Sequence, residues 1–160
     1  MKILGIDPAL GTTGYGLIEV SGTAFRLVEA GVIETRAQEC LPARLEKIYT
    51  AVESILSEFR PEAAALEKIY SHYAHPATSY ILGHARGVIC LACARAGVSL
   101  AEYAATRIKK AIVGKGLASK QQVQKMVMDS LGMKEPPAYM DITDALALAI
   151  GHSFICRSKI

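Results

Sequence analysis

The chain has 160 residues, is 51% hydrophobic and 21% charged, and carries a formal net charge of +3. This length and composition predict one globular domain, residues 1–160, with a core that needs no disulfides. No apolar run approaches the roughly 18 residues of a membrane span, and the first residues resemble a strand rather than a signal peptide, so a membrane protein is excluded and a cytoplasmic one is predicted.

Three strands and a helix are predicted in the first part of the chain. Residues 2–34 alternate apolar segments with glycine-containing turns, which is typical of a three-stranded meander, and Gly31 marks a bulge or bend in the third strand. Residues 41–59 have apolar side chains at helical spacing, and Pro61 ends this helix. The segment AAALEKI, residues 63–69, is a short buried strand that runs into an acid.

A long helix follows a polar block at residues 71–80. We expect the helix at residues 79–97, where Gly83 and Gly87 allow close approach of a neighbouring element. Its CxxC sequence lies in an apolar pattern, which favours packed thiols over a redox or zinc site. The remaining elements predicted are a strand at residues 98–103 and helices near residues 105–113, 119–131 and from 141 onward.

This order of elements predicts an α/β layered fold of ribonuclease-H-like type. Strands joined by a short turn pair antiparallel, whereas strands separated by a helix pair in parallel. We therefore expect a mixed five-stranded sheet with antiparallel first three strands, parallel later strands and helices on both faces.

Four acids lie where apolar core segments end or begin. Asp7 closes the first strand before Pro8 and a glycine-rich turn, and Glu67 closes the fourth, so both open onto the crevice at the carboxyl ends of the strands. Asp141 and Asp144 are three residues apart, which places them on one face of the last helix. Helix capping, with Asp141 as the N-cap, and a metal site both explain that pair, and spacing alone leaves the two open.

Clustered carboxylates repel one another unless a cation joins them. Mg²⁺ prefers oxygen ligands and is held by a few carboxylates together with waters and phosphate oxygens. Two such ions roughly 3.5–4 Å apart clamp the attacking and leaving oxygens of a phosphodiester. The four acids together therefore favour a divalent metal site with hydrolysis as its chemistry.

A basic run separates the last predicted strand from the last helix. Residues 107–125 contain six Lys or Arg side chains and no acid. A solvated basic face and a polyanion-binding surface explain the run equally well, and the lack of aromatic residues argues against a single-strand stacking platform. Ser119 and Gln122 form a capping box at the start of the helix that carries Lys120.

Five motifs, taken together and in order, resemble the RuvC family of Holliday junction resolvases. They are LGIDPALGTTGYGLIE, ALEKIY, GHARGV, EYAATRIKKAIVGKGLASKQQVQKMV and DITDALALAI, and they extend from residue 3 to about residue 152. The resemblance implies a homodimeric crossover junction endodeoxyribonuclease that makes paired symmetric nicks in four-way junctions during DNA recombination and repair. Branch-migration proteins of the RuvA and RuvB type are its implied partners.

The resemblance also implies roles for individual residues. The catalytic and metal-binding tetrad would be Asp7, Glu67, Asp141 and Asp144. It would hold Mg²⁺, with two ions in each active site and Mn²⁺ as a substitute. Lys109 and Lys120 match basic residues that serve DNA binding and catalysis, and Tyr70 matches an aromatic that touches bases near the crossover. Lys115 and Arg107 are further expected DNA contacts.

Other classes share part of this pattern. An actin-like phosphotransferase is disfavoured because it needs two related domains, and the sequence has no GxxxxGK[ST] loop. A non-catalytic junction-binding module would need a tetrad acid replaced, whereas a related nuclease acting on other branched DNA remains open. His72 and His75 favour a DNA-facing or solvated loop over a zinc site, and His84 favours helix packing or a dimer face.

Overall fold

The computed structural model describes residues 1–68 and 76–157 and contains one sheet and five helices within them. The strands are β1 (Lys2–Asp7), β2 (Thr12–Ser21), β3 (Ala24–Glu34), β4 (Ala63–Glu67) and β5 (Ser99–Tyr103). The helices are α1 (Leu41–Phe59), α2 (Pro76–Arg95), α3 (Ala105–Val113), α4 (Lys120–Leu131) and α5 (Met140–Arg157). None of these helices combines the length and hydropathy needed to cross a bilayer.

The sheet has the strand order β3-β2-β1-β4-β5. β2 pairs antiparallel with β1 and with β3, while β4 pairs in parallel with β1 and with β5. The predicted mixed sheet is therefore confirmed. Because β1 and β4 are parallel neighbours, their carboxyl ends meet at the same edge in the middle of the sheet.

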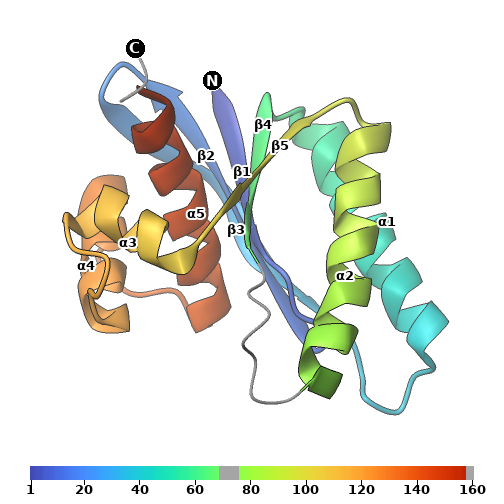
Figure 1. Cartoon of the computed structure of the whole chain (residues 1–160). Coiled ribbons are helices and arrows are strands. Elements are labelled where there is room, and N and C mark those ends of the chain that lie inside the picture. Colours follow the sequence, from blue (N-terminus) through green and yellow to red (C-terminus); the bar gives the residue numbers. More distant parts are fainter. Residues whose placement is uncertain (69–75, 158–160) are drawn as a thin grey trace.

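Helices cover both faces of the sheet, with α1 and α2 on one side and α3, α4 and α5 on the other (Figure 1). Each side encloses its own apolar cluster. The cluster under α2 includes Cys93, which is fully buried, and burial raises the pKa of its thiol to about 11. The prediction that the CxxC thiols are packed rather than reactive is supported by this burial.

Helix α5 packs across β1 and β2 at very short range because glycines face it. A side chain at Gly5 would collide with the backbone oxygen of Ala145, and one at Gly14 would collide with the backbone of Asp141. Residues 145–150 of this helix are all buried, as their apolar sequence predicts. The glycines thus fix the height of α5 above the sheet.

The predicted bulge at Gly31 is wrong. The bulge in β3 lies at Val28, because Leu17 pairs with Glu29 whereas Ile18 pairs with Leu27. Gly31 is in regular register, and its lack of a side chain leaves room for the ring of Tyr15.

The glycines of α2 have open space beside them. Among the described residues, no other element comes within 4 Å of a Cβ placed at Gly83 or Gly87, so the close approach that they would allow stays a prediction. Both face outward from the body of the molecule.

Candidate functional site

The site begins with two carboxylates at adjacent strand ends. Asp7 is the last residue of β1 and Glu67 the last residue of β4, and the preceding residues, Ile6 and Leu66, are paired in register. Both strands are buried up to these positions, and the acids are the first side chains to emerge from the core. The predicted meeting of the two acids at one sheet edge follows directly from the parallel pairing.

The start of α5 brings the other two acids to the same edge. Asp141 is seated against Gly14, and Gly14 is the register partner of Asp7 in the β1–β2 pair. Helix α5 begins at Met140, so Asp141 lies in its first turn. The prediction that Asp141 is the N-cap residue is therefore wrong, because the helix starts slightly earlier than predicted. Asp144 lies three residues further along the same helix.

Electrostatics shows that the four acids share one environment. The pKa of Asp7 is raised from 3.8 to about 7, first by burial and then by the negative charges of Asp144, Glu67 and Asp141. The pKa of Glu67 is raised by burial and by Asp144, and is lowered by nearby basic residues. A carboxyl group whose pKa is raised by neighbouring negative charges in this way is typical of a cation-binding or catalytic site.

Lys120, from helix α4, lies beside these acids. Lys120 is the first residue of α4, and its Nζ lies 3.0 Å from Oδ2 of Asp144. This hydrogen bond raises the pKa of Lys120. The capping box of Ser119 and Gln122 is confirmed and holds the start of α4 in place.

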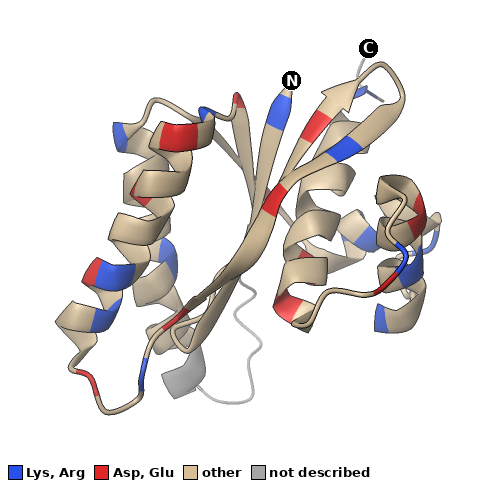
Figure 2. Ribbon diagram, turned by 180° about the vertical axis from the view of Figure 1, so that it is seen from behind, with Lys and Arg blue, Asp and Glu red and all other residues tan. Residues whose placement is uncertain are grey.

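A cavity of about 200 Å³ lies between these elements. Its polar lining consists of Glu67, Lys109, Lys120 and Asp144. Apolar side chains from α3, α4 and α5 form the remainder of its wall, among them Ile108, Val123 and Leu148. In Figure 2, basic segments of α3 and α4 flank the acidic start of α5. The cavity therefore places positive and negative groups around one small space.

Arg107 and Lys115, two further predicted DNA contacts, are not among the residues that line the cavity. Arg107 packs over the ring of Tyr103, with its guanidinium carbon 5.6 Å from the ring centre. Lys115 is exposed in the loop between α3 and α4. Tyr70 is outside the described residues.

Two predictions about histidines have different outcomes. His72 and His75 are outside the described residues. His84 packs edge to face against Tyr80, with ring centres 4.5 Å apart, in agreement with a packing role on α2.

Arg86 is a further residue of this region that the sequence did not single out. Its guanidinium donates to the backbone carbonyl of Glu67 and to the carboxylate of Glu102. It therefore ties the end of β4 to β5 and lowers the pKa of Glu67 by its charge. The motif GHARGV contains this arginine, but a contact between α2 and two strand ends is not visible in sequence spacing.

The four acids fit a hard divalent cation such as Mg²⁺, because such ions prefer oxygen ligands and each acid supplies carboxylate oxygens. The repulsion that raises the pKa of Asp7 is what such a cation would relieve. As the side chains stand, no three His, Cys, Asp or Glu groups of the described chain converge closely enough to enclose a metal ion. Asp144 is instead turned toward Lys120.

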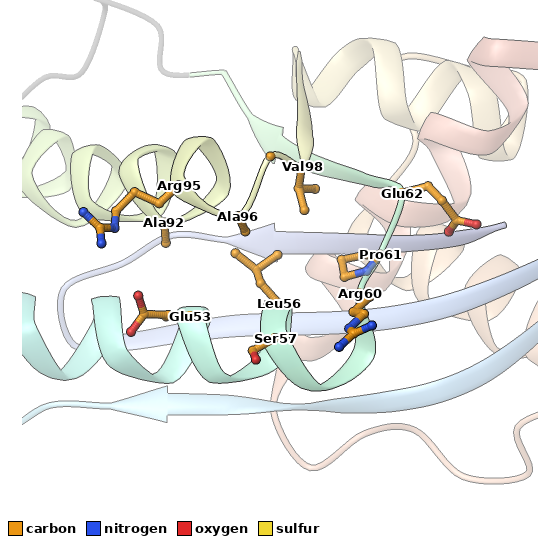
Figure 3. A pocket seen from close by; sticks show the side chains of 11 residues that line it. Glu53, Leu56, Ser57, Arg60, Pro61, Glu62, Ala92, Arg95, Ala96 and Val98 are labelled. Carbon is orange, nitrogen blue, oxygen red and sulfur yellow. The ribbon is translucent and has the colours of Figure 1, made fainter.

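A larger cavity of about 510 Å³ lies at the opposite end of the sheet, between the ends of α1 and α2 (Figure 3). Its charged lining residues are Glu53, Arg60, Glu62 and Arg95. Glu62 accepts a hydrogen bond from the backbone N–H of Lys2 and so stabilises the strand entry. The charges here are of mixed sign and serve local structure.

Comparison with known proteins gives a consistent result. A family model described as crossover junction endodeoxyribonuclease RuvC matches residues 3–152. A crossover junction endodeoxyribonuclease RuvC from Rhodopirellula baltica is 42% identical over 158 residues, which cover 99% of this chain and 89% of the relative. The solved structure of Thermus thermophilus RuvC is similar with a TM-score of 0.93 at 35% identity, covering 99% of this chain and 97% of the other. A structure of T. thermophilus RuvC in complex with a Holliday junction substrate is similar with a TM-score of 0.92 at 34% identity, covering 99% and 96%.

Proposed function

The chain belongs to the RuvC family of crossover junction endodeoxyribonucleases, and we propose that it resolves Holliday junctions by paired, metal-dependent nicks. The observation that carries the chemistry is geometric: Asp7 and Glu67 end adjacent parallel strands, and Asp141 is seated against Gly14, the register partner of Asp7. The pKa of Asp7, raised by burial and then by the charges of the other three acids, supports it. The structure of a similar protein with a Holliday junction substrate supports four-way junctions as the DNA that is cut.

The acids would act as metal ligands. We assign this role to Asp7, Glu67, Asp141 and Asp144. Divalent ions, Mg²⁺ in the first place and Mn²⁺ as a substitute, would supply an activated water and neutralise charge on the phosphate, and two ions per site suit phosphodiester hydrolysis. The chain contributes a rigid frame, because strands β1 and β4 and the buried helix α5 hold the carboxylates at fixed heights.

The basic residues would hold the DNA backbone. Lys120 is at the amino end of α4, where free backbone N–H groups and the helix dipole favour a phosphate. Lys109 lines the same cavity on the adjacent helix α3. Arg107 and Lys115 would contact phosphates further from the cut, and Tyr70 would contact bases near the crossover.

Paired nicks need two active sites related by two-fold symmetry, which calls for a homodimer. The outward side of α2 is our candidate interface. The helix exposes three large apolar side chains, Tyr80, Ile81 and Leu91, and the open glycines Gly83 and Gly87 lie on the same helix. Glycines at this spacing allow two helices to approach closely. Leu91→Glu should give a monomer in sedimentation velocity at micromolar concentration, whereas a wild-type monomer would contradict the assignment.

A cleavage assay on three DNA substrates tests the function. We expect symmetric paired nicks on a mobile four-way junction in Mg²⁺, none on plain duplex or a flap, and none in excess chelator. Equal cutting of flaps would favour a nuclease for other branched DNA. Junction binding without cleavage in any divalent metal would favour a non-catalytic binding module.

A further inference from the structure

The contact between Lys120 and Asp144 joins a residue assigned to the DNA phosphate with a residue assigned to the metal. Nζ of Lys120 lies 3.0 Å from Oδ2 of Asp144, and the two side chains are 62% and 28% exposed. The pair bridges α4 and α5, which also share an apolar cluster and a contact of the Gln124 amide with the sulfur of Met140. The ammonium group of Lys120 therefore already forms an ion pair with one of the four acids.

The backbone on both sides of this ion pair is fixed. The capping box at Ser119 and the burial of Val123 hold the first turn of α4. Thr143 and Ala145, on either side of Asp144, are buried in the core. The ion pair can therefore open by rotation of the lysine side chain alone, without movement of a helix.

A divalent ion and the lysine ammonium compete for the same carboxylate. The metal ion and the ammonium group are both positive and both bind an oxygen of Asp144. Metal binding to Asp144 therefore favours dissociation of Lys120 from that carboxylate. In the described residues, no three potential ligands enclose a metal ion while Lys120 holds Asp144. The departing ammonium needs a new anion, and a DNA phosphate in the adjoining cavity supplies one.

We propose that Lys120 exchanges Asp144 for a DNA phosphate when a divalent metal enters the site, so that metal and junction DNA strengthen each other's binding. This proposal rests on the function proposed above. Without DNA, the metal must displace the lysine into water, which lowers the metal affinity of the free protein. With DNA, the phosphate takes the lysine and the metal gains a phosphate oxygen as ligand. Because such coupling is reciprocal, metal raises DNA affinity by the same factor.

The first test measures Mn²⁺ binding to the full chain without DNA by isothermal titration calorimetry. Lys120→Gln should bind Mn²⁺ about three- to tenfold more tightly than the wild type, because the competitor for Asp144 is gone. Lys134→Gln removes the same charge from the exposed loop between α4 and α5 and should change the affinity less than about twofold. Lys120→Arg restores a cation and should return the affinity toward that of the wild type. Circular dichroism melts confirm that each variant is folded.

The second test measures coupling. In the wild type, Ca²⁺ should tighten junction binding by a factor that falls at least threefold in Lys120→Gln. A merely structural ion pair between α4 and α5 predicts unchanged or weaker Mn²⁺ affinity in Lys120→Gln, and either result overturns the exchange.

The outcomes separate this proposal from the proposed function. If Mn²⁺ binds the wild type and does not bind Asp7→Asn, the proposed metal site is supported. The Mn²⁺ affinity of Lys120→Gln then tests the proposed exchange by itself. If Mn²⁺ does not bind the wild type at all, the metal site fails and the exchange fails with it.

Discussion

The two ends of the sheet each carry a cavity, but they differ in how their charges are arranged. At the carboxyl ends of β1 and β4, the cavity is about 200 Å³, and burial together with neighbouring negative charges raises the pKa of Asp7 and of Glu67. At the amino ends of β4 and β5, the cavity is about 510 Å³ and its charges serve local contacts such as that of Glu62 with Lys2. We assign the chemistry to the smaller cavity, because crowding by like charges that raises the pKa of a carboxyl group, rather than cavity volume, indicates a functional site.

Neutral replacement of an acid at each end gives the largest contrast. Asp144→Asn should lower junction cleavage by at least about a hundredfold, the loss typical of removing one group that stabilises developing charge. Glu53→Gln, in the larger cavity, should leave cleavage within about twofold of the wild type. Single-turnover cleavage rates in Mg²⁺ measure both. Equal losses in the two variants would remove the distinction between the ends.

The pH dependence of metal binding is the next largest effect. The pKa of Asp7 is about 7, so the metal-free protein carries a proton there below neutral pH. Metal binding must release it, and we expect Mn²⁺ affinity to rise by up to about tenfold per pH unit from pH 5 to 7 and then to level off. Calorimetry in buffers of different ionisation enthalpy counts the released proton. A flat affinity between pH 5 and 8 would contradict the raised pKa.

Charge removal from a lysine should change the salt dependence of DNA binding. In the presence of Ca²⁺, Lys120→Ala should weaken junction binding and reduce the slope of log K against log salt by about 0.9, the value for one lost phosphate contact. Arg60→Ala, at the larger cavity, is the matched control and should leave the slope unchanged. Fluorescence anisotropy at several salt concentrations distinguishes the two. An unchanged slope in Lys120→Ala would show that this lysine does not contact phosphate.

The smallest predicted effect concerns stability without metal. Because the folded state raises the pKa of Asp7 from 3.8 to about 7, its contribution to stability is present at low pH and is lost as the pH rises through 7. The shift corresponds to at most about 4 kcal/mol, and relaxation of the site reduces it. Asp7→Asn should therefore raise the free energy of unfolding at pH 8 by roughly 1–3 kcal/mol and leave it nearly unchanged at pH 4. Urea denaturation in chelator at both pH values measures this, and destabilisation at pH 8 would contradict it.

Sequence reasoning succeeded where a local pattern determines the outcome. The periodicity of residues 41–59 gave the bounds of α1, and the parallel order of β1 and β4 brought Asp7 and Glu67 together. The capping box at Ser119 is equally local, since donor and acceptor are three residues apart.

Sequence reasoning failed where the outcome depends on a distant partner. The bulge lies at Val28 rather than Gly31, a position set by the register of β3 against β2. The contact of Arg86 with the end of β4 and the ion pair of Lys120 with Asp144 each join two different elements, through residues that are 19 and 24 positions apart in the chain. No spacing rule predicts such contacts, because they arise from how helices settle on the sheet.

One paired measurement on Asp7→Asn tests the central claim that the convergent acids cut junction DNA through metal ions. Nicking of a mobile four-way junction in Mg²⁺ and gel-shift affinity for the same junction without metal are measured side by side on the variant and the wild type. The account predicts that nicking is lost while the gel shift persists at similar affinity. Retained nicking by Asp7→Asn would contradict it.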